Sequence, residues 1–465
     1  ISSISYSRKR KKLLSVYCTG HKEPVRHFFD AEEEALRKRI KAHFPGYRYG
    51  MADTDKEEAH ALIYVGNDRT RGSYYFYDVA TDTATKLADT APWIREEEMV
   101  EMHDVTYTTR DGLHIEAYLS LPHGVTLEGA KQLPVVVNPH GGPWARDTWG
   151  YSSEVQFLCN RGYAVFQMNF RGSTGYGRQF LEASYKQWGL KMQDDITDGV
   201  NWLISKGIAD RKRIAIYGGS YGGYATLAGV AFTPDLYACG VDYVGVSNLF
   251  TFMKTIPPYW RPMLEMMYEQ VGNPEADKEQ LAATSPALHA DKIRVPLFVA
   301  QGANDPRVNK AESDQMVEAL RQAYEDWRSQ LPGGAFCVGV SSSAAGIREL
   351  RKCYEESITA LRRRPVQSEE TVVFAQPDSS PPKPPFLPDD LEVQLREFLE
   401  KPASAYLTAY VKSILDRNYQ DNVSYEAYLS ACDVINRFVG RVVRSRDEIV
   451  YADLIKIDPM NYVYT

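Results

Sequence analysis

The stretch that most constrains this chain is an apolar strand that runs into a glycine-framed serine and out into an alanine-rich helix. It covers residues 213–224, with Ser220 between Gly218 and Gly222. A serine hydroxyl that projects from so sharp a turn leaves no room for side chains at the two glycines. Free N–H groups at the start of the following helix favour negative charge developing beside the serine. The pattern is typical of a nucleophile elbow, from which Ser220 would attack a carbonyl.

Other glycine-rich motifs fit this stretch poorly. A dinucleotide-binding fingerprint needs glycine at position 220, and a phosphate-binding loop needs to end in Gly-Lys-Ser or Gly-Lys-Thr. A merely structural strand-to-helix turn is the alternative to the elbow, because a bare Gly-x-Ser-x-Gly also occurs by chance.

The composition is that of an ordinary globular chain. Its 465 residues, 44% hydrophobic and 25% charged, suit two or three domains. The formal net charge of -7 argues against nucleic-acid binding as the main role, and the basic run at residues 8–12 is expected on a solvated hairpin edge. No apolar run approaches the roughly 20 residues of a membrane helix. We expect neither nucleic acid nor a membrane as partner.

The cysteines are scattered and have no Cys-x-x-Cys spacing. This arrangement fits reduced thiols better than a disulfide framework or a zinc site, so we expect a reducing, cytoplasmic compartment. The residues concerned are Cys18, Cys159, Cys239, Cys337, Cys353 and Cys432.

The first hundred residues alternate short apolar strands with turns and contain a loose repeat. Residues 13–17 and 26–30 are echoed by residues 62–65 and 74–78. The 48-residue interval from Asp30 to Asp78 suits four-stranded propeller blades. Helical spacing at residues 31–43 predicts an inserted helix. A closed propeller needs at least four blades, so residues 1–100 predict a partial β-propeller of about two.

From residue 101 the sequence pattern changes to that of alternating strands and helices. A hairpin is expected at the Asp111-Gly112 turn, and buried-type strands follow at residues 133–137, 163–166, 214–216 and 296–300. Continuous apolar strands separated by helices predict a mostly parallel sheet covered on both faces. We therefore predict an α/β domain over residues 101–323.

Beyond residue 323 this pattern ends, and we predict a separate α+β segment over residues 324–465. Its elements are expected as a strand at 334–340, a helix at 344–363, a Pro/Ser-rich linker at 376–388, helices at 390–400, 403–418 and 425–445, and a strand at 448–451.

Two further groups are placed where serine chemistry needs them. The loop at residues 138–143 follows a buried strand and is rich in glycine, so the N–H of Gly142 would join the N–H of Tyr221 in an oxyanion hole. A plain Gly-Pro turn is the alternative. Asp305 follows the last buried strand, where a triad acid comes after the serine in chain order. An N-cap role for Asp305 would be compatible with that assignment.

Residues 101 to about 322 resemble the catalytic domain of the prolyl oligopeptidase family, closest to its acylaminoacyl peptidase and dipeptidyl aminopeptidase branch. Four motifs in order carry the resemblance, at residues 140–143, 169–177, 218–224 and 302–308. The resemblance implies an α/β-hydrolase fold, a preceding β-propeller that screens substrates by size, and hydrolysis of short peptides through an acyl-enzyme. Ser220 would be the nucleophile, Asp305 the acid, and Gly142 and Tyr221 the oxyanion donors. No cofactor is expected.

The resemblance also suggests where a substrate would bind. Phe252, Tyr259 and Trp260 follow a loop that in the family helps to line the specificity pocket, and core packing is the equal alternative.

An acidic helical stretch at Asp194, Asp195 and Asp198 suggests a metal site. No histidine lies near it in sequence. We therefore favour a solvated or capping role and expect no metal.

The chain lacks the histidine that the family uses as the general base. The family places a histidine roughly thirty residues past the aspartate, in a loop after the last strand. Here every histidine precedes Asp305, at positions 21, 27, 43, 60, 103, 114, 123, 140 and 289. His140 is not expected to substitute, and losing the base costs on the order of a millionfold in turnover. The sequence predicts an impaired serine peptidase or, alternatively, an inactive truncated or fused scaffold that acts as a binding or regulatory module.

The C-terminal segment, residues 334 to about 444, faintly resembles the spacer domain of bacterial two-component response regulators. Residues 338–343 and 347–361 carry this impression. Neither a receiver nor DNA-reading helices can be found, so regulation of transcription does not follow. We expect residues 335–340 to take the vacated edge of the hydrolase sheet.

Overall fold

The computed structural model describes residues 2–20, 23–256 and 264–330, and further along 338–340, 359, 372–374, 384–391, 393–395, 404–421, 423–424, 427–428, 430–435 and 437. Its contacts divide the chain into two compact units, Ile1–Ala319 and Leu320–Thr465.

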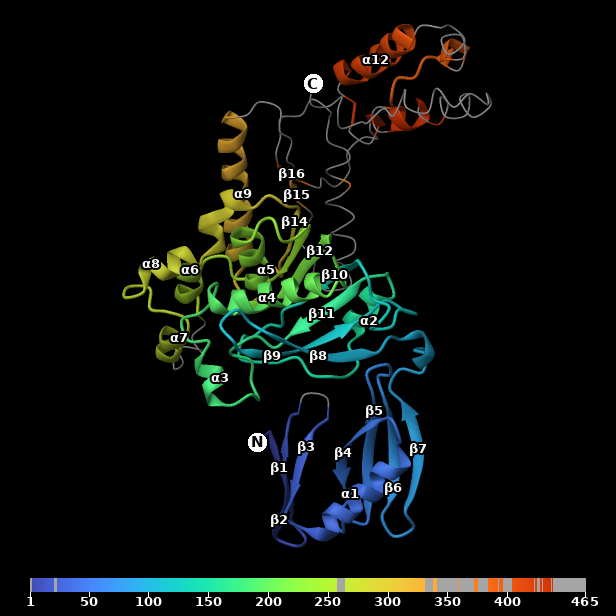
Figure 1. The fold of residues 1–465 in the computed structure, drawn as a ribbon, viewed down its shortest axis with the longest axis vertical. Helices are drawn as coiled ribbons and strands as arrows, with labels where there is room; N and C mark the ends of the chain where they lie inside the picture. Colours follow the sequence, from blue (N-terminus) through green and yellow to red (C-terminus); the bar gives the residue numbers. More distant parts are fainter. Residues whose placement is uncertain are drawn as a thin grey trace. The chain divides into compact units, whose positions relative to one another are not determined.

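The first unit begins with two antiparallel sheets (Figure 1). One has three strands, β1 (Ser3–Ser7), β2 (Lys12–Cys18) and β3 (Val25–Phe28). The other has four, β4 (Arg48–Thr54), β5 (His60–Gly66), β6 (Ser73–Asp78) and β7 (Thr83–Asp89). The helix α1 (Ala31–His43) lies between them in sequence, as its spacing predicted. Each half of the sequence repeat forms two neighbouring antiparallel strands, β2 with β3 and β5 with β6. A partial, propeller-like architecture is therefore confirmed.

The basic run at residues 8–12 forms the turn of the β1–β2 hairpin and is largely neutralised. Arg10 donates to Asp30 at 2.8 Å, and Lys12 contacts the same carboxylate. Asp30 also accepts the N–H of Glu33 at 2.8 Å and so caps α1. The hydrogen bond from Lys12, aided by the Glu33 N–H, lowers the pKa of Asp30 to about 2. These contacts tie the hairpin to the helix.

A seven-stranded sheet forms the centre of the unit, in the order β14-β13-β12-β10-β11-β9-β8. The bounds are β8 (Met102–Thr108), β9 (His114–Ser120), β10 (Leu133–Val137), β11 (Ala164–Met168), β12 (Ala209–Gly219), β13 (Cys239–Tyr243) and β14 (Leu297–Ala300). The strands from β11 to β14 are parallel, whereas β9 runs antiparallel to both β8 and β11.

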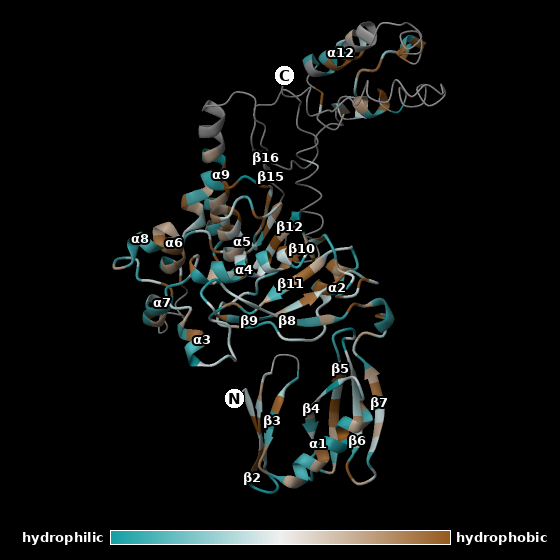
Figure 2. Cartoon of the chain, in the orientation of Figure 1, coloured by the Kyte–Doolittle hydropathy of each residue, from teal (hydrophilic) through white to brown (hydrophobic). Residues whose placement is uncertain are grey.

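The helices of this part of the chain are α2 (Ser153–Cys159), α3 (Arg178–Glu182), α4 (Lys191–Ser205), α5 (Tyr221–Phe232), α6 (Leu249–Lys254), α7 (Leu264–Gln270), α8 (Lys278–Ala283) and α9 (Lys310–Gln330), with short 3₁₀ turns at η1 (Glu96–Glu98) and η3 (Pro286–Lys292). Of these, α2, α4 and α5 pack against strands of the sheet (Figure 1). On α4 the residues Met192, Ile196, Val200 and Leu203 are fully buried, at the spacing of one helix face. Figure 2 shows the hydrophobic residues concentrated on the central strands. The predicted α/β-hydrolase fold is confirmed.

Polar contacts fasten the four-stranded sheet to the central domain. Arg48 of β4 donates to the Trp149 carbonyl at 2.8 Å, and its guanidinium lies 4.2 Å from the Trp149 ring. Asp68 accepts the N–H of Met102 at 2.7 Å, and the Gln156 amide donates to the Asp68 carbonyl at 3.0 Å. These contacts explain why residues 1–319 form a single compact unit. The predicted boundary after residue 100 falls inside it.

The second unit has a small core of its own. The helix α12 (Ser404–Gln420) confirms the helix expected at residues 403–418. Its buried residues Ile414 and Leu415 share a hydrophobic cluster with Leu395 and Tyr428.

One strand prediction for this unit was wrong. The strand β15 (Val338–Val340) pairs in parallel with β16 (Val372–Phe374) in a separate two-stranded sheet, and does not extend the edge at β14. Pairing with the apolar strand β16 satisfies backbone N–H and C=O groups of β15. The sequence of β15 contains no feature that predicts this pairing. The helix expected at 344–363, apart from residue 359, and the strand at 448–451 lie outside the described residues.

Within the described ranges, none of the helices has the length and apolarity to cross a membrane. The cysteines described there, Cys18, Cys159, Cys239 and Cys432, are free thiols. Burial raises the pKa of the Cys159 thiol to about 12, which keeps it protonated.

Candidate active site

Ser220 lies at the junction of β12 and α5, as the sequence predicts. Its backbone has φ 58° and ψ −118°, a left-handed conformation that costs a non-glycine residue on the order of 1–3 kcal/mol. The N–H of Ser220 donates to the Tyr243 carbonyl at 2.9 Å, and the residue is exposed. The surrounding fold therefore holds a solvent-facing hydroxyl in a strained turn.

Gly222 is required by a close approach of two backbone segments. A Cβ added there would lie 2.2 Å from the Pro139 carbonyl oxygen. A Cβ on Gly218 would in turn lie 2.6 Å from the Gly222 carbonyl. The glycines that frame Ser220 thus let the start of α5 pack directly on the loop after β10.

Replacing Gly222 by alanine is expected to lower the free energy of unfolding by about 2 kcal/mol, because forcing a methyl group into such a contact shifts backbone. Urea unfolding followed by tryptophan fluorescence measures the loss. Gly207→Ala is no suitable control because its φ is +71°; Gly50→Ala, where an added Cβ meets nothing within 4 Å, is the matched variant. Equal effects of the two substitutions would contradict the steric argument.

The loop at residues 138–143 lies against the serine. A Cβ built on Gly141 would be 3.5 Å from the Ser220 Cβ, which fixes how close the two segments are. Gly142 adopts φ +124°, open to glycine. In the described part of the chain, the N–H groups of Gly142 and Tyr221 donate to no acceptor. Two free amide donors, the ones the sequence singles out, therefore accompany the serine.

Asp305 lies in the loop between β14 and α9. Its Oδ1 accepts the N–H groups of Arg307 and Val308, at 2.8 and 2.9 Å. This oxygen therefore caps its own turn and does not provide the N-cap of α9, which begins at Lys310. Oδ2 has no hydrogen-bond partner among the described residues, so it can accept from another group.

Strand register brings Ser220 and Asp305 to one edge of the sheet. Gly219 at the end of β12 is opposite Tyr243 of β13, and Tyr243 is opposite Ala300 of β14. The two loops therefore begin two strand spacings apart, about 10 Å.

No described histidine hydrogen-bonds to Ser220 or Asp305. His289 binds the Ala282 carbonyl at 3.1 Å, and the ring nitrogens of His140 bind Ser173 Oγ at 2.8 Å and the Gly141 carbonyl at 2.7 Å. Burial lowers the pKa of His140 to about 4. His140 is therefore a neutral side chain that is already engaged.

The pKa of His140 makes the stability of the first unit pH-dependent. An unfolded histidine has a pKa of about 6.5, so as the pH falls the unfolded chain binds the proton before the folded chain does. The free energy of unfolding should be unaffected by this group above pH 6.5 and fall by up to about 3 kcal/mol towards pH 4. Urea unfolding at pH 7, 5 and 4 tests this, with His140→Asn as the non-titrating control. A parallel pH profile in both chains would refute the assignment.

The predicted pocket residues have different outcomes. Phe252 is only 6% exposed and stacks on Trp188, with ring centroids 6.3 Å apart, inside the core of the domain. Its position agrees with the core-packing alternative. Tyr259 and Trp260 lie outside the described residues.

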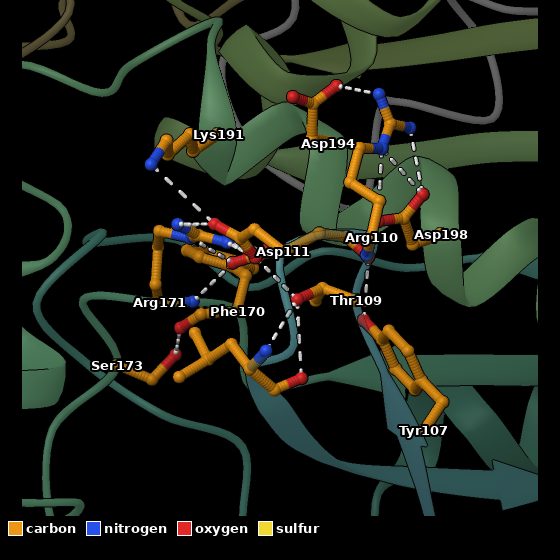
Figure 3. A network of polar contacts seen from close by, with 12 residues as sticks. Tyr107, Thr109, Arg110, Asp111, Phe170, Arg171, Ser173, Lys191, Asp194 and Asp198 are labelled. Carbon is orange, nitrogen blue, oxygen red and sulfur yellow. Dashed lines mark hydrogen bonds and ion pairs between the residues drawn. The ribbon is translucent and has the colours of Figure 1, made fainter.

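The acidic residues of α4 bind arginines (Figure 3). Asp194 and Asp198 pair with Arg110, each at 2.8 Å. Asp195 points the other way, has a fully buried side chain and pairs with Arg171 at 2.7 Å. The expected solvated or capping role was therefore wrong for Asp195. Across the described ranges, no group of three metal-ligating side chains is assembled.

The buried Arg171–Asp195 ion pair was not predicted, although the sequence contains a signal for it. Asp195 occupies the stripe of α4 that Met192, Ile196 and Val200 bury, and a carboxylate in that stripe needs a cation.

Glu312 of α9 was also missed and offered no such signal. Its carboxylate accepts the N–H groups of Ser247 and Asn248, both at 2.9 Å, and contacts the Thr251 hydroxyl. Glu312 is 1% exposed. It fixes the start of α9, and with it the Asp305 loop, against the segment after β13.

A comparison with family profiles matches residues 149–331, which contain Ser220 and Asp305, to the prolyl oligopeptidase family. This part of the chain belongs to that family. Three of the four motifs, at residues 169–177, 218–224 and 302–308, lie within the matched range.

Two curated relatives are similar to this chain over about half of its length. Dipeptidyl aminopeptidase BIII of Pseudoxanthomonas mexicana is 46% identical over 254 residues, which are 53% of this chain and 37% of the relative. Dipeptidyl peptidase family member 6 of Caenorhabditis elegans is 41% identical over 271 residues, 54% of this chain and 37% of the relative. The chain thus spans well under half the length of these relatives.

Among solved structures, a puromycin hydrolase is similar, with a TM-score of 0.51 and 29% identity, over 57% of this chain and 40% of that one. Somewhat more than half of the chain therefore resembles a solved structure that is named as a hydrolase.

Proposed function

We propose that this chain carries the nucleophile, the acid and the oxyanion hole of a serine peptidase that acts on short peptides. Ser220 is the nucleophile, Asp305 the acid, and the N–H groups of Gly142 and Tyr221 are the oxyanion donors. One observation carries the proposal: an exposed serine in a strained turn lies beside amide N–H groups that have no acceptor in the described chain. The names of the relatives support peptides as the substrate class.

In this reaction the Ser220 oxygen attacks a peptide carbonyl and the carbonyl oxygen takes up negative charge. Two amide N–H groups aimed at that oxygen stabilise the tetrahedral intermediate. The C–N bond then breaks, the amine leaves with a proton, and water hydrolyses the acyl ester on Ser220. The proton that Ser220 loses needs a base, and residues 306–465 contain no histidine. We therefore expect a competent nucleophile site with slow turnover.

A second candidate is a hydrolase scaffold that binds peptides without cleaving them. It is favoured by the engagement of His140 and His289 elsewhere, together with the absence of histidine after Asp305.

A fluorophosphonate probe tests the proposal. Slow labelling that maps to Ser220 and disappears in Ser220→Ala supports a nucleophile site. Labelling no faster than that of Ser220→Ala would refute it and favour the binding scaffold. Asp305→Asn keeps an oxygen for the Arg307 and Val308 N–H groups, so it should fold and serves as the isosteric variant for the acid.

A further inference from the structure

A pocket of about 570 Å³ opens beside the end of α4. Most of its lining lies within residues 127–132, in the loop before β10, and within residues 202–208, where α4 turns into β12; Val105 of β8 completes it. We call it the α4 pocket. The strand β12 leads from this turn to Ser220 over 11 residues, which span roughly 30 Å. The α4 pocket is therefore separate from the candidate active site.

Much of the lining of the α4 pocket is apolar. Ala130 and Ile208 are 5% and 7% exposed and belong to the main hydrophobic core. Trp202 adds an aromatic surface, and its ring packs on Phe166 and Tyr107, with centroids 6.2 and 6.3 Å apart. Among the described residues the Trp202 Nε1–H has no acceptor. The core thus holds a tryptophan in place that can still donate a hydrogen bond.

Backbone hydrogen bonds join the two segments that line the pocket, so it is formed without a ligand. The N–H of Gln132 donates to the Gly207 carbonyl at 2.9 Å, and the N–H of Leu133 donates to the Ile208 carbonyl at 2.7 Å. The Arg213 guanidinium donates to the Gln132 carbonyl at 2.7 Å. Gln132 has φ 49°, a left-handed conformation that is unfavourable for a residue other than glycine. These contacts hold a strained residue at the edge of the pocket.

The charged side chains of the lining are unpaired. They are Lys131, Lys206 and Glu128, and none of them forms an ion pair with a described residue. Two ammonium groups and one carboxylate give the lining a net positive charge, although the whole chain has a formal charge of -7. The charge favours an anionic ligand, and the apolar surface between the charged groups favours a ligand with an apolar body.

We propose that the α4 pocket binds a small amphipathic carboxylate with an aromatic or branched aliphatic body. The body packs on Trp202, Leu127 and Val105, and the carboxylate accepts hydrogen bonds from Lys131 and Lys206. The volume lies within the range of about 300–1,000 Å³ that is usual for small-molecule sites, and so does a mostly apolar lining with a few polar groups. The inference goes beyond the proposed function and does not depend on the chemistry of Ser220.

Ligand-observed NMR titrations of the full chain test the ligand class. We expect saturable binding of 3-phenylpropanoate. The uncharged 3-phenylpropan-1-ol should bind about fivefold more weakly, and 3-phenylpropylamine more weakly still, because they lack the carboxylate that the lysines attract. Absence of saturable binding, or an amine that binds as tightly as the carboxylate, would overturn the proposal. Tighter binding of phenylalanine would also contradict it, because Glu128 would then select a zwitterion.

Lysine variants test the charged groups. The double variant Lys131→Gln with Lys206→Gln should raise the Kd of 3-phenylpropanoate about tenfold and leave that of the alcohol unchanged. Lys278→Gln is the matched control, because it replaces an exposed lysine of α8 that does not line the pocket. Equal Kd values in the double variant and the control would refute binding by the two lysines.

Photo-cross-linking tests the place of binding. Irradiated 4-benzoylbenzoate, an aromatic carboxylate, inserts into nearby C–H bonds, and mass spectrometry locates the adduct. We expect adducts within residues 125–132 or 202–208 that an excess of 3-phenylpropanoate suppresses. Adducts confined to other segments, such as those around Ser220, would assign the binding to another site and overturn the proposal.

Discussion

The chain is expected to cleave dipeptidyl 4-nitroanilides on the order of a millionfold more slowly than the dipeptidyl aminopeptidase BIII of Pseudoxanthomonas mexicana assayed beside it. The reason is the missing proton acceptor. No histidine follows Asp305, and His140 is neutral and bonded to Ser173 and Gly141. Loss of the base from a serine triad costs about 10⁶ in turnover, while an intact oxyanion hole leaves a residual rate of about 10³–10⁴ over water.

Release of 4-nitroaniline measures both rates under one set of conditions. Turnover within a hundredfold of the relative, abolished by Ser220→Ala, would show that a base reaches Ser220 from another part of the chain or from a second copy. The dependence of the specific activity on chain concentration would then separate these sources, because a base from a second copy acts only when chains associate.

Replacing Arg171 by methionine is expected to lower the free energy of unfolding by about 3–5 kcal/mol. The substitution leaves Asp195 buried without its cation, and an unpaired buried charge costs that much. Burial raises the pKa of Asp195 against the pull of Arg171, so part of the cost will appear as uptake of a proton. The loss should therefore shrink as the pH is lowered from 8 to 5.

Urea unfolding measures this loss, and two variants define its origin. Arg171→Met combined with Asp195→Leu removes both charges and should recover most of the stability. Arg110→Met breaks a pair whose arginine is 52% exposed and should cost less than about 1 kcal/mol. A loss in Arg171→Met below that of Arg110→Met would contradict a stabilising role for the Arg171–Asp195 ion pair.

The elbow was predictable because its requirements are local. A strand of apolar residues, a serine between glycines and a helix-forming run define the turn within residues 213–224. The structure adds the contact that makes Gly222 necessary, with the Pro139 carbonyl from a segment far away in sequence. The sequence likewise identifies Gly142 and Tyr221 by their positions in the loop and after the serine. The fold leaves their N–H groups without an acceptor among the described residues.

The assignments that were left open or were wrong concern residues whose role depends on a partner elsewhere. Phe252 and a pocket residue look alike in sequence, because only the neighbouring Trp188 decides that the ring is covered. Asp195 was grouped with Asp194 and Asp198, although the helix turns it towards Arg171. The strand β15 was assigned to the sheet edge, and its pairing with β16 required knowledge of a strand 34 residues further along.

The sequence by itself determined the order of the chemical groups along the chain: a nucleophile turn, a glycine-rich loop before it, a carboxylate after it, and no histidine beyond. These are properties of short segments, and backbone sterics link such segments directly to their conformation. Only the tertiary structure decided how these groups are supported, through the Arg171–Asp195 ion pair, the His140–Ser173 hydrogen bond and the Glu312–Ser247 hydrogen bond. Each of these joins residues that are distant in sequence, and burial from water is what makes their hydrogen bonds strong enough to hold a site in place.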